Sequence, residues 1–290
     1  MLAPLLQRAK SGRFTRASAH HVTMWLGSRC PDLFPMVCVL GFPKSGTTWA
    51  CHLVADYMRL PFPQFALLPH TFAAVVHGHE VPRPRHQPLV YVVRDGRDAA
   101  VSFYFMALRS MRKGERQHAA LLPGSVEEAE NIREHLPRFL ERFMVKTPAS
   151  PAPWGEHCRA FFAARPERSG ILRYERLLSD GAAELAGCLR DVTGEEPEMD
   201  RVGWALEKHS FARTAKRKPG EEDANSHRRK GVAGDWRNYF TREAAEVFDH
   251  HAGDVLVELG YERDRSWVDS CDAGALASGG STAAGAASVG

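Results

Sequence analysis

The segment Val37-Cys-Val-Leu-Gly-Phe42 leads directly into Pro43-Lys-Ser-Gly-Thr-Thr-Trp49, and this junction decides the fold. A short apolar run bounded by glycine and proline predicts a buried strand. Residues 47–59 carry apolar side chains at helical spacing, so we expect a helix there. Backbone N–H groups of a glycine-containing loop between a strand and a helix converge on an anion. The segment therefore predicts an α/β fold with a site for a phosphate-like group.

The rest of the chain alternates short apolar runs with amphipathic segments, the pattern of a parallel sheet covered by helices. We expect further strands at 73–76, 89–93 and 170–174, and helices at 99–111 and 125–143. Ser125 and Glu128 have capping-box spacing at the start of the last helix, and Pro137 predicts a kink within it. The expected fold class is α/β, a single three-layer domain with a central parallel sheet and a phosphate-binding strand–loop–helix.

The 290 residues include 38 basic and 35 acidic side chains, which gives a net charge of +3 with neutral histidines. So small a charge does not by itself indicate a nucleic-acid-binding protein, and we expect no nucleic-acid partner. No stretch reaches the roughly 18 apolar residues of a spanning helix, so we expect no integral membrane segment. The six cysteines form no CxxC pair. Free thiols in a reducing compartment, and hence a cytoplasmic location, are the expectation.

The two ends of the chain differ from its middle. Residues 1–35 form a basic lead-in without an acidic side chain before position 32. We interpret it as an amphipathic approach to the first strand; the alternative is a transit segment for import into an organelle. Residues 267–290 are rich in alanine, glycine and serine and predict a disordered tail. The expected domain therefore covers residues 36–266.

The glycine-containing loop differs from the nucleotide-triphosphatase loop GxxxxGK[ST] in one chemically important way. Gly41 and Gly46 have the separation of its two glycines, but Thr47 stands where its lysine belongs, and the lysine is Lys44, inside the loop. A lysine there can reach a bridging oxygen, while the hydroxyls of Thr47 and Thr48 satisfy non-bridging oxygens. An ordinary turn before a helix is the alternative interpretation, but proline, lysine, glycine and paired threonines rarely coincide.

This loop resembles that of the sulfotransferases that use 3′-phosphoadenosine 5′-phosphosulfate (PAPS), which reads much like PKSGTTW. Two more segments are similar to that family: Tyr91-Val-Val-Arg-Asp-Gly-Arg-Asp-Ala-Ala-Val-Ser102 and Arg228-Arg-Lys-Gly-Val-Ala-Gly-Asp-Trp-Arg-Asn238. Tyr174 matches the family's adenine-contacting tyrosine, and Phe211 matches the aromatic that sandwiches the base against Trp49. The resemblance runs from about residue 36 to 262. It implies an enzyme, a PAPS-dependent sulfotransferase that produces 3′-phosphoadenosine 5′-phosphate (PAP).

The resemblance also implies roles for individual residues. Lys44 is implied to be catalytic by stabilising charge on the bridging oxygen, and Arg94 to grip the 3′-phosphate through a charge-assisted fork. The competing interpretations are an Arg94–Asp98 ion pair, a solvated basic face at 228–230, and core packing for Tyr174 and Phe211. No metal is expected. The residues implied to bind the donor are Lys44, Ser45, Gly46, Thr47, Thr48, Trp49, Arg94, Ser102, Tyr174, Phe211, Arg229, Lys230 and Gly231.

The catalytic base is implied by the family's KTHxP pattern, which Val76-His-Gly-His-Glu-Val-Pro82 matches in part. His79 takes the position of the base, and a histidine suits proton removal because its ordinary pKa lies near neutrality. The lysine and threonine of the pattern are absent, and the spacing from His79 to Arg94 is shorter than in the animal cytosolic enzymes. His70, His77 and Glu80 therefore stay as alternatives.

By this resemblance, the sulfuryl group passes in line to a hydroxyl or amine of a small-molecule acceptor. Two alternatives stay open: a non-catalytic nucleotide-binding protein of the same fold, and a phosphate-loop kinase or hydrolase, against which Thr47 argues. Segments 60–88 and 104–150 are expected to form the acceptor pocket, with either basic or aromatic side chains. The acceptor itself is not predicted.

Oligomeric state is left open by a departure from the family's dimerisation pattern, KxxxTVxxxE. Its positions are occupied here by Arg237, Thr241, Arg242 and Glu246. Arg242 replaces the apolar valine, and a charge at the centre of an interface requires a partner.

Overall fold

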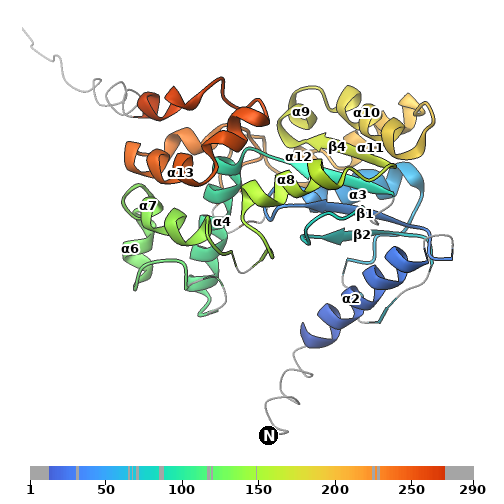
Figure 1. Ribbon diagram of the computed structural model, residues 1–290, viewed down its shortest axis with the longest axis horizontal. Helices are drawn as coiled ribbons and strands as arrows, with labels where there is room; N and C mark the ends of the chain where they lie inside the picture. Colours follow the sequence, from blue (N-terminus) through green and yellow to red (C-terminus); the bar gives the residue numbers. More distant parts are fainter. Residues whose placement is uncertain are drawn as a thin grey trace, which may run out of the picture. The chain divides into compact units, whose positions relative to one another are not determined.

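A computed structural model describes residues 13–30, 33–64, 66, 68–69, 72–84, 88–115, 118, 120–147, 149–223, 226 and 229–271. The chain divides into two compact units (Figure 1). The first takes its described residues from 1–94 and 146–233, and the second from 95–145 and 234–290. Each unit has a buried core of its own. Whether residues 36–266 form one domain stays a prediction.

The first unit is built on a four-stranded parallel sheet with the order β2-β1-β3-β4. In the central strand, Val39 lies opposite His77 of one neighbour and Val90 of the other. The strands are β1 (Met36–Gly41), β2 (Ala74–Gly78), β3 (Leu89–Val93) and β4 (Ser169–Arg173). The helices of this unit are α2 (Arg13–Arg29), α3 (Thr47–Met58), α8 (Trp154–Ala164), α9 (Tyr174–Ser179), α10 (Gly181–Thr193), α11 (Met199–Lys208) and α12 (Phe211–Ala215).

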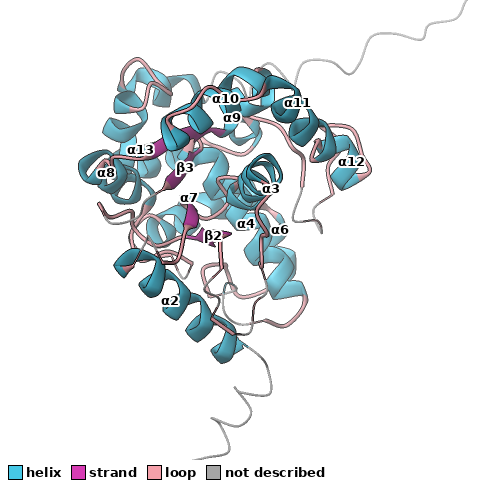
Figure 2. Cartoon of the chain, turned by 90° about the vertical axis from the view of Figure 1, so that its right-hand side faces the viewer, coloured by secondary structure: helices cyan, strands magenta, loops and turns pink. Residues whose placement is uncertain are grey.

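Helices cover both faces of this sheet. On one face, Val39 and Val92 belong to a buried cluster that includes apolar residues of α3, α10 and α11; Figure 2 shows α9, α10 and α11 side by side. On the other face, Tyr91 stacks on Phe161 of α8 at 4.3 Å between ring centroids. Gly27 of α2 lies so close to β1 that an added Cβ would be 2.9 Å from Met36 Sδ. The predicted α/β fold class with a central parallel sheet is confirmed.

Burial on both faces explains the sequence of the central strands. Every residue of β1 and β3 is buried, and strands covered by helices on both sides read as continuous apolar runs instead of alternating patterns. For the same reason these strands could be found from the sequence within one or two residues of their ends. None of the helices in the described ranges combines the length and apolar character that crossing a bilayer requires.

The second unit is helical. Its elements are α4 (Gly96–Arg112), α6 (Val126–Glu130), α7 (Ile132–Phe143), α13 (Arg242–Glu258) and the short 3₁₀ helices η1 (Asp235–Asn238) and η2 (Arg265–Asp269). Helix α4 contacts α6, α7 and η1, while α13 contacts α7 and η2. Aromatic rings fill the space between them; for example, Phe139 and Phe143 stack at 5.1 Å, and Trp236 meets Trp267 edge to face at 5.7 Å.

Two sequence predictions for the second unit are wrong in detail. The helix expected at 125–143 with a kink at Pro137 is two helices, because Asn131, at ψ 71°, leaves the helical region between them. Pro137 lies inside α7 and does not mark the break between the helices. The predicted capping box of Ser125 and Glu128 is confirmed. The tail expected from residue 267 starts too early, since Trp267 is buried against the unit's aromatic core. Residues 272–290 lie outside the described residues.

A fully buried arginine organises the second unit. Arg97 donates to Asp95 (Nη2–Oδ2 2.7 Å) and to Glu262 (Nη1–Oε1 2.6 Å). Its guanidinium carbon also lies 3.8 Å from the ring centroid of Trp236 and 4.6 Å from that of Trp267. A buried cation needs such compensation, because removal from water costs several kcal/mol unless ion pairs and hydrogen bonds replace the lost hydration.

We expect Arg97→Gln to lower the free energy of unfolding by about 3–5 kcal/mol, since it leaves Asp95 and Glu262 without their buried cation. Equilibrium unfolding in urea, followed by circular dichroism, measures the change. Arg242→Gln is the matched control, because Arg242 makes exposed ion pairs with Glu246 and Asp269 on the same unit. A control loss as large as that of Arg97→Gln would contradict the special role of the buried site.

Candidate active site

The loop between β1 and α3 has the backbone geometry of an anion site. Lys44 has φ 72° and Gly46, the N-cap of α3, has φ 92°. Left-handed residues in such a turn direct backbone N–H groups into one concavity at the positive end of a helix. Ser45 between them is buried, and its Oγ has no hydrogen-bond partner among the described residues. A buried hydroxyl in this state fits a loop that a bound anion completes.

The ring of Tyr174, at the start of α9, lies against this loop. A Cβ added to Gly46 would be 2.8 Å from Tyr174 Cδ2, so only glycine allows the ring this close in a left-handed position. Trp49 meets the same ring edge to face at 6.0 Å, and the Arg94 guanidinium lies 4.2 Å from its centroid. The structure thus brings together residues from three of the sequence motifs.

Arg94 connects the loop to the downstream basic segment, residues 228–238. Its Nη1 donates to the carbonyl of Lys44 at 3.0 Å, and its Nη2 donates to the carbonyl of Val232 at 3.4 Å. The indole of Trp154 donates to the Arg94 carbonyl at 3.2 Å. Asp98, the partner in the competing interpretation, accepts from the backbone N–H groups of Gly234 and Trp236 within the second unit.

The downstream segment places two cations beside one carboxylate. Arg229 Nη1 contacts Glu222 Oε1 at 2.5 Å, and Lys230 Nζ lies 3.8 Å from Glu222 Oε2. Gly231 has φ 64°, and a Cβ there would collide with the ring of Phe211. Arg228 lies outside the described residues. Glu222 could not be identified from the sequence, because no motif marks it.

His79 is held in the tautomer that a base requires. Its Nδ1 lies 2.7 Å from the carbonyl oxygen of Gly41. A carbonyl only accepts, so Nδ1 carries the proton and Nε2 carries the lone pair. Burial lowers the pKa of His79 below its ordinary 6.5, because desolvation penalises the charged imidazolium. At neutral pH the side chain is therefore a neutral imidazole.

The alternative bases have other contacts. His77 Nε2 lies 3.2 Å from Thr47 Oγ1, and burial, reinforced by the neighbouring His79, lowers the pKa of His77 to about 3. His77 thus orients one of the threonines expected to bind phosphate. Glu80 lies 3.8 Å from His20 Nε2 on α2. His70 lies outside the described residues.

A buried histidine that no sequence motif marks contacts the backbone of His79. His157 on α8 is fully buried; its Nε2 donates to the carbonyl of His79 at 3.2 Å, and its Nδ1 accepts from the Tyr91 hydroxyl at 2.9 Å. The two hydrogen bonds fix the backbone of the segment that carries His79. The available signal was a tyrosine inside the apolar run 89–93, because a buried hydroxyl needs a partner.

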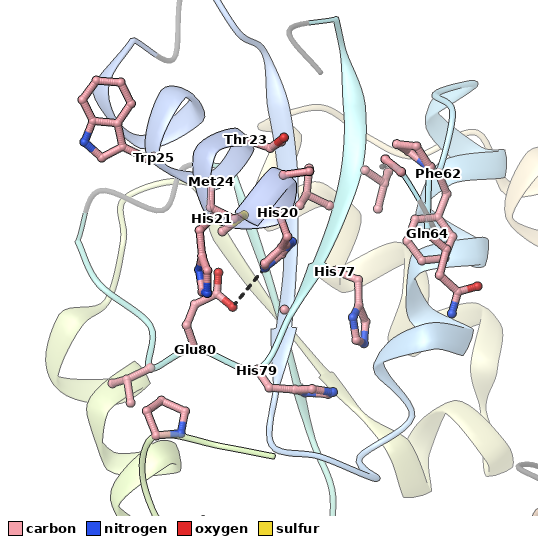
Figure 3. Close-up of a pocket in the computed structure, with 18 of the residues that line it drawn as sticks. His20, His21, Thr23, Met24, Trp25, Phe62, Gln64, His77, His79 and Glu80 are labelled. Atoms are coloured by element: carbon pink, nitrogen blue, oxygen red, sulfur yellow. Dashed lines mark ion pairs between the residues drawn. The ribbon is translucent and has the colours of Figure 1, made fainter. Parts of the chain in front are cut away.

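A cavity of about 940 Å³ opens beside His77 and His79 (Figure 3). Figure 3 shows these two side chains adjacent to each other, with the His20–Glu80 ion pair beside them. Helix α2 forms one wall, and the loop after α3 forms another. The lining combines apolar and polar side chains; among them are Met24, Trp25, Phe62, Gln64, Glu80 and Arg83.

The remaining predicted residues lie as follows. Ser102 is a half-buried residue of α4 in the second unit, and Thr48 is a half-buried residue of the first turn of α3. In the proposed dimer pattern, Thr241 caps α13, and Arg242 pairs with Glu246. Arg237 lies 4.4 Å from the ring centroid of Trp236.

We expect stability to fall as the pH decreases from about 6.5 towards 4. Burial lowers the pKa of His157 from 6.5 to about 4, so in this window the unfolded chain binds a proton that the folded chain excludes. Each such group contributes a slope of about 1.4 kcal/mol per pH unit. Urea unfolding across the window should give a smaller slope for His157→Gln, whose amide keeps both hydrogen bonds. An unchanged slope would contradict the neutral, buried state of His157.

Comparisons with known proteins identify the family and the fold. A family model described as a sulfotransferase domain matches residues 83–260. Sulfotransferase 1 family member D1 of Rattus norvegicus is 26% identical over 257 residues, which cover 73% of this chain and 80% of that protein. Sulfotransferase 1E1 of Homo sapiens is 25% identical over 255 residues, which cover 72% and 80%.

Two solved structures share the fold. Mouse sulfotransferase SULT7A1 complexed with PAP superposes with a TM-score of 0.53 at 17% identity, covering 79% of this chain and 90% of that one. Retinol dehydratase in complex with androsterone and inactive cofactor PAP gives 0.51 at 18% identity, covering 81% and 85%. Since the family model matches more than half of the residues, this chain belongs to the sulfotransferase family.

Proposed function

We propose that this protein transfers the sulfuryl group of PAPS to a hydroxyl or amine of a small-molecule acceptor and releases PAP. One observation carries the proposal: a neutral His79, with its Nδ1 proton bonded to Gly41, lines a cavity at the end of the strand that leads into the Lys44 loop. A proton acceptor, a cation and an anion-binding loop are the groups that transfer of a charged group to a hydroxyl needs.

The loop fits the 5′-phosphosulfate end of the donor. Backbone N–H groups around Ser45 and Gly46, with the hydroxyls of Thr47 and Thr48, would bind the 5′-phosphate. The buried Ser45 Oγ would gain a partner there. Lys44 would neutralise charge on the oxygen that leaves with PAP. The Trp49 and Tyr174 rings, already in contact, would bind adenine together with Phe211, as the family resemblance implies.

The basic segment fits the 3′-phosphate. Arg94, Arg229 and Lys230 supply three cations from the first unit, and Arg94 is already bonded to Val232, beside Gly231. Arginine offers a planar fork that matches phosphate oxygens. Ser102, which the family resemblance also implies at this phosphate, belongs to the second unit, and its role stays a prediction. Together these groups would select a nucleotide that carries a 3′-phosphate over one that lacks it.

The transfer step conserves its atoms and charges as follows. The acceptor oxygen or nitrogen attacks the sulfur of PAPS, and the bond between sulfur and the bridging phosphate oxygen breaks. His79 Nε2 takes the acceptor proton, and PAP leaves with the bridging oxygen and its negative charge. Lys44 stabilises that charge as it develops. His157 acts on the step only through the backbone of His79, as a positioning residue.

The acceptor would occupy the cavity beside His79. Its volume of about 940 Å³ lies in the range of small-molecule pockets. Phe62 and Trp25 offer apolar surface, while Gln64 and Arg83 offer hydrogen-bond donors. This combination suits an acceptor with an apolar body and a polar group. The pocket thus contains both kinds of side chain, aromatic and basic, that were expected as alternatives from the sequence.

Free thiols support a reducing compartment, and we propose the cytoplasm. The six cysteines, all within the described ranges, form no disulfide. Four of them are buried, and burial raises the pKa of Cys38 and Cys158 to about 12. Such thiols are structural and unreactive.

Isothermal titration calorimetry with PAP tests the donor site. We expect a dissociation constant in the micromolar range or below, about 10- to 100-fold weaker binding of adenosine 5′-phosphate because it lacks the charge-assisted bonds of the 3′-phosphate, and no dependence on Mg²⁺. Mg²⁺-dependent preference for ATP would instead favour a kinase or hydrolase. Binding of PAP with no turnover of PAPS against a broad acceptor panel would favour a non-catalytic protein.

We expect His79→Gln to lower kcat by about 10²- to 10⁴-fold with unchanged PAP affinity, because the amide can keep the bond to Gly41 but cannot take a proton. In the unaltered enzyme, kcat/KM should fall with acid only below pH 6.5, since burial lowers the pKa of His79 and the neutral form is active. His250→Gln, at an exposed position of α13, is the control. Retained turnover in His79→Gln would transfer the role to another base.

A further inference from the structure

The cations expected to bind the 3′-phosphate already hold an anion of the same chain. Arg229 Nη1 lies 2.5 Å from Glu222 Oε1, and Lys230 Nζ lies 3.8 Å from Glu222 Oε2, so one carboxylate spans both cations. Arg229 is buried and Lys230 is half-buried, whereas about one third of the Glu222 side chain is exposed. The carboxylate therefore closes this pair of cations from the solvent side.

The backbone around Glu222 fixes its place. Gly220 N donates to the carbonyl of Lys230 and Asp223 N donates to the carbonyl of Arg229, each at 2.9 Å. Arg217 Nη1 adds a bond to the Arg229 carbonyl at 3.1 Å. These bonds pair the two sides of the loop, so that Glu222 faces the cations across a short hydrogen-bonded ladder.

A phosphate and this carboxylate exclude each other at the same cations. Two anions within a few ångströms repel strongly where solvent is limited, and Arg229 Nη1, which bonds to Glu222, belongs to a guanidinium that the proposed function assigns to the phosphate. A bound 3′-phosphate therefore has to displace Glu222 into solvent, which its partial exposure permits. Displacement of Glu222 costs the free energy of its ion pairs, and the net free energy of 3′-phosphate binding is less favourable by that amount.

We propose that Glu222 is an internal competitor of the 3′-phosphate, which pairs with Arg229 and Lys230 in the nucleotide-free protein and weakens binding of every nucleotide that carries this group. The inference rests on the proposed function. The carboxylate keeps a buried arginine compensated when no nucleotide is bound. It also returns to the cations as PAP departs, and so it increases the rate of product release.

The test compares Glu222→Gln with the full chain by calorimetric titration. Removal of the competing charge should tighten PAP binding about tenfold, the scale of a partly buried charge-assisted bond, and leave adenosine 5′-phosphate unchanged. Stopped-flow displacement of PAP should show slower release from the variant. Glu221→Gln is the matched control, because it removes the same charge from the adjacent residue. Glu221 Oε2 accepts from Lys218 N, and the amide oxygen of glutamine can accept the same bond.

The outcomes separate the two proposals. If the unaltered protein binds no PAP, the proposed function fails. If it binds PAP but Glu222→Gln binds PAP no more tightly, or more weakly because the loop needs the carboxylate, the competitor role is overturned and the donor site stands. Equal tightening in Glu221→Gln and Glu222→Gln would also overturn it, since a general change in charge would then explain both.

Discussion

The candidate site depends on the contacts of one side-chain group, the guanidinium of Arg94. It bonds to the carbonyls of Lys44 and Val232 and lies over the ring of Tyr174, so one side chain at the end of β3 joins segments far apart in the sequence. An arginine can do this because its donors lie in one rigid plane and its flat face can stack on an aromatic ring. Lysine offers neither property.

The arrangement also explains why the loop can keep a left-handed lysine. A positive φ at Lys44 costs free energy in any residue with a Cβ. The Lys44 carbonyl is held by Arg94, and the next turn is held by the ring of Tyr174 against Gly46. The strained loop conformation is thus held by contacts from outside the loop.

The parts of the molecule that were predictable from the sequence are those determined by local pattern. Continuous apolar runs located the strands because both faces are buried, and the order of residues in the loop indicated its anion-binding geometry. Glu222, His157 and Tyr91 were not found as site residues, because their roles depend on contacts between segments distant in the sequence or on loop folding. The break at Asn131 was missed for a related reason: the apolar positions of 125–143 fit one helix as well as two. Trp267 was assigned to the tail because no regular spacing of apolar residues surrounds it. Its packing against Trp236 shows that it is part of a core.

Helix α2 has a consequence for how this enzyme could diversify. It forms one wall of the cavity that His79 lines. The loop, the basic segment and the histidine to which the proposed function assigns the donor and the base all belong to other elements. Under the proposed function, exchange of this helix would reshape the acceptor pocket and leave unchanged the residues assigned to the donor and to the base.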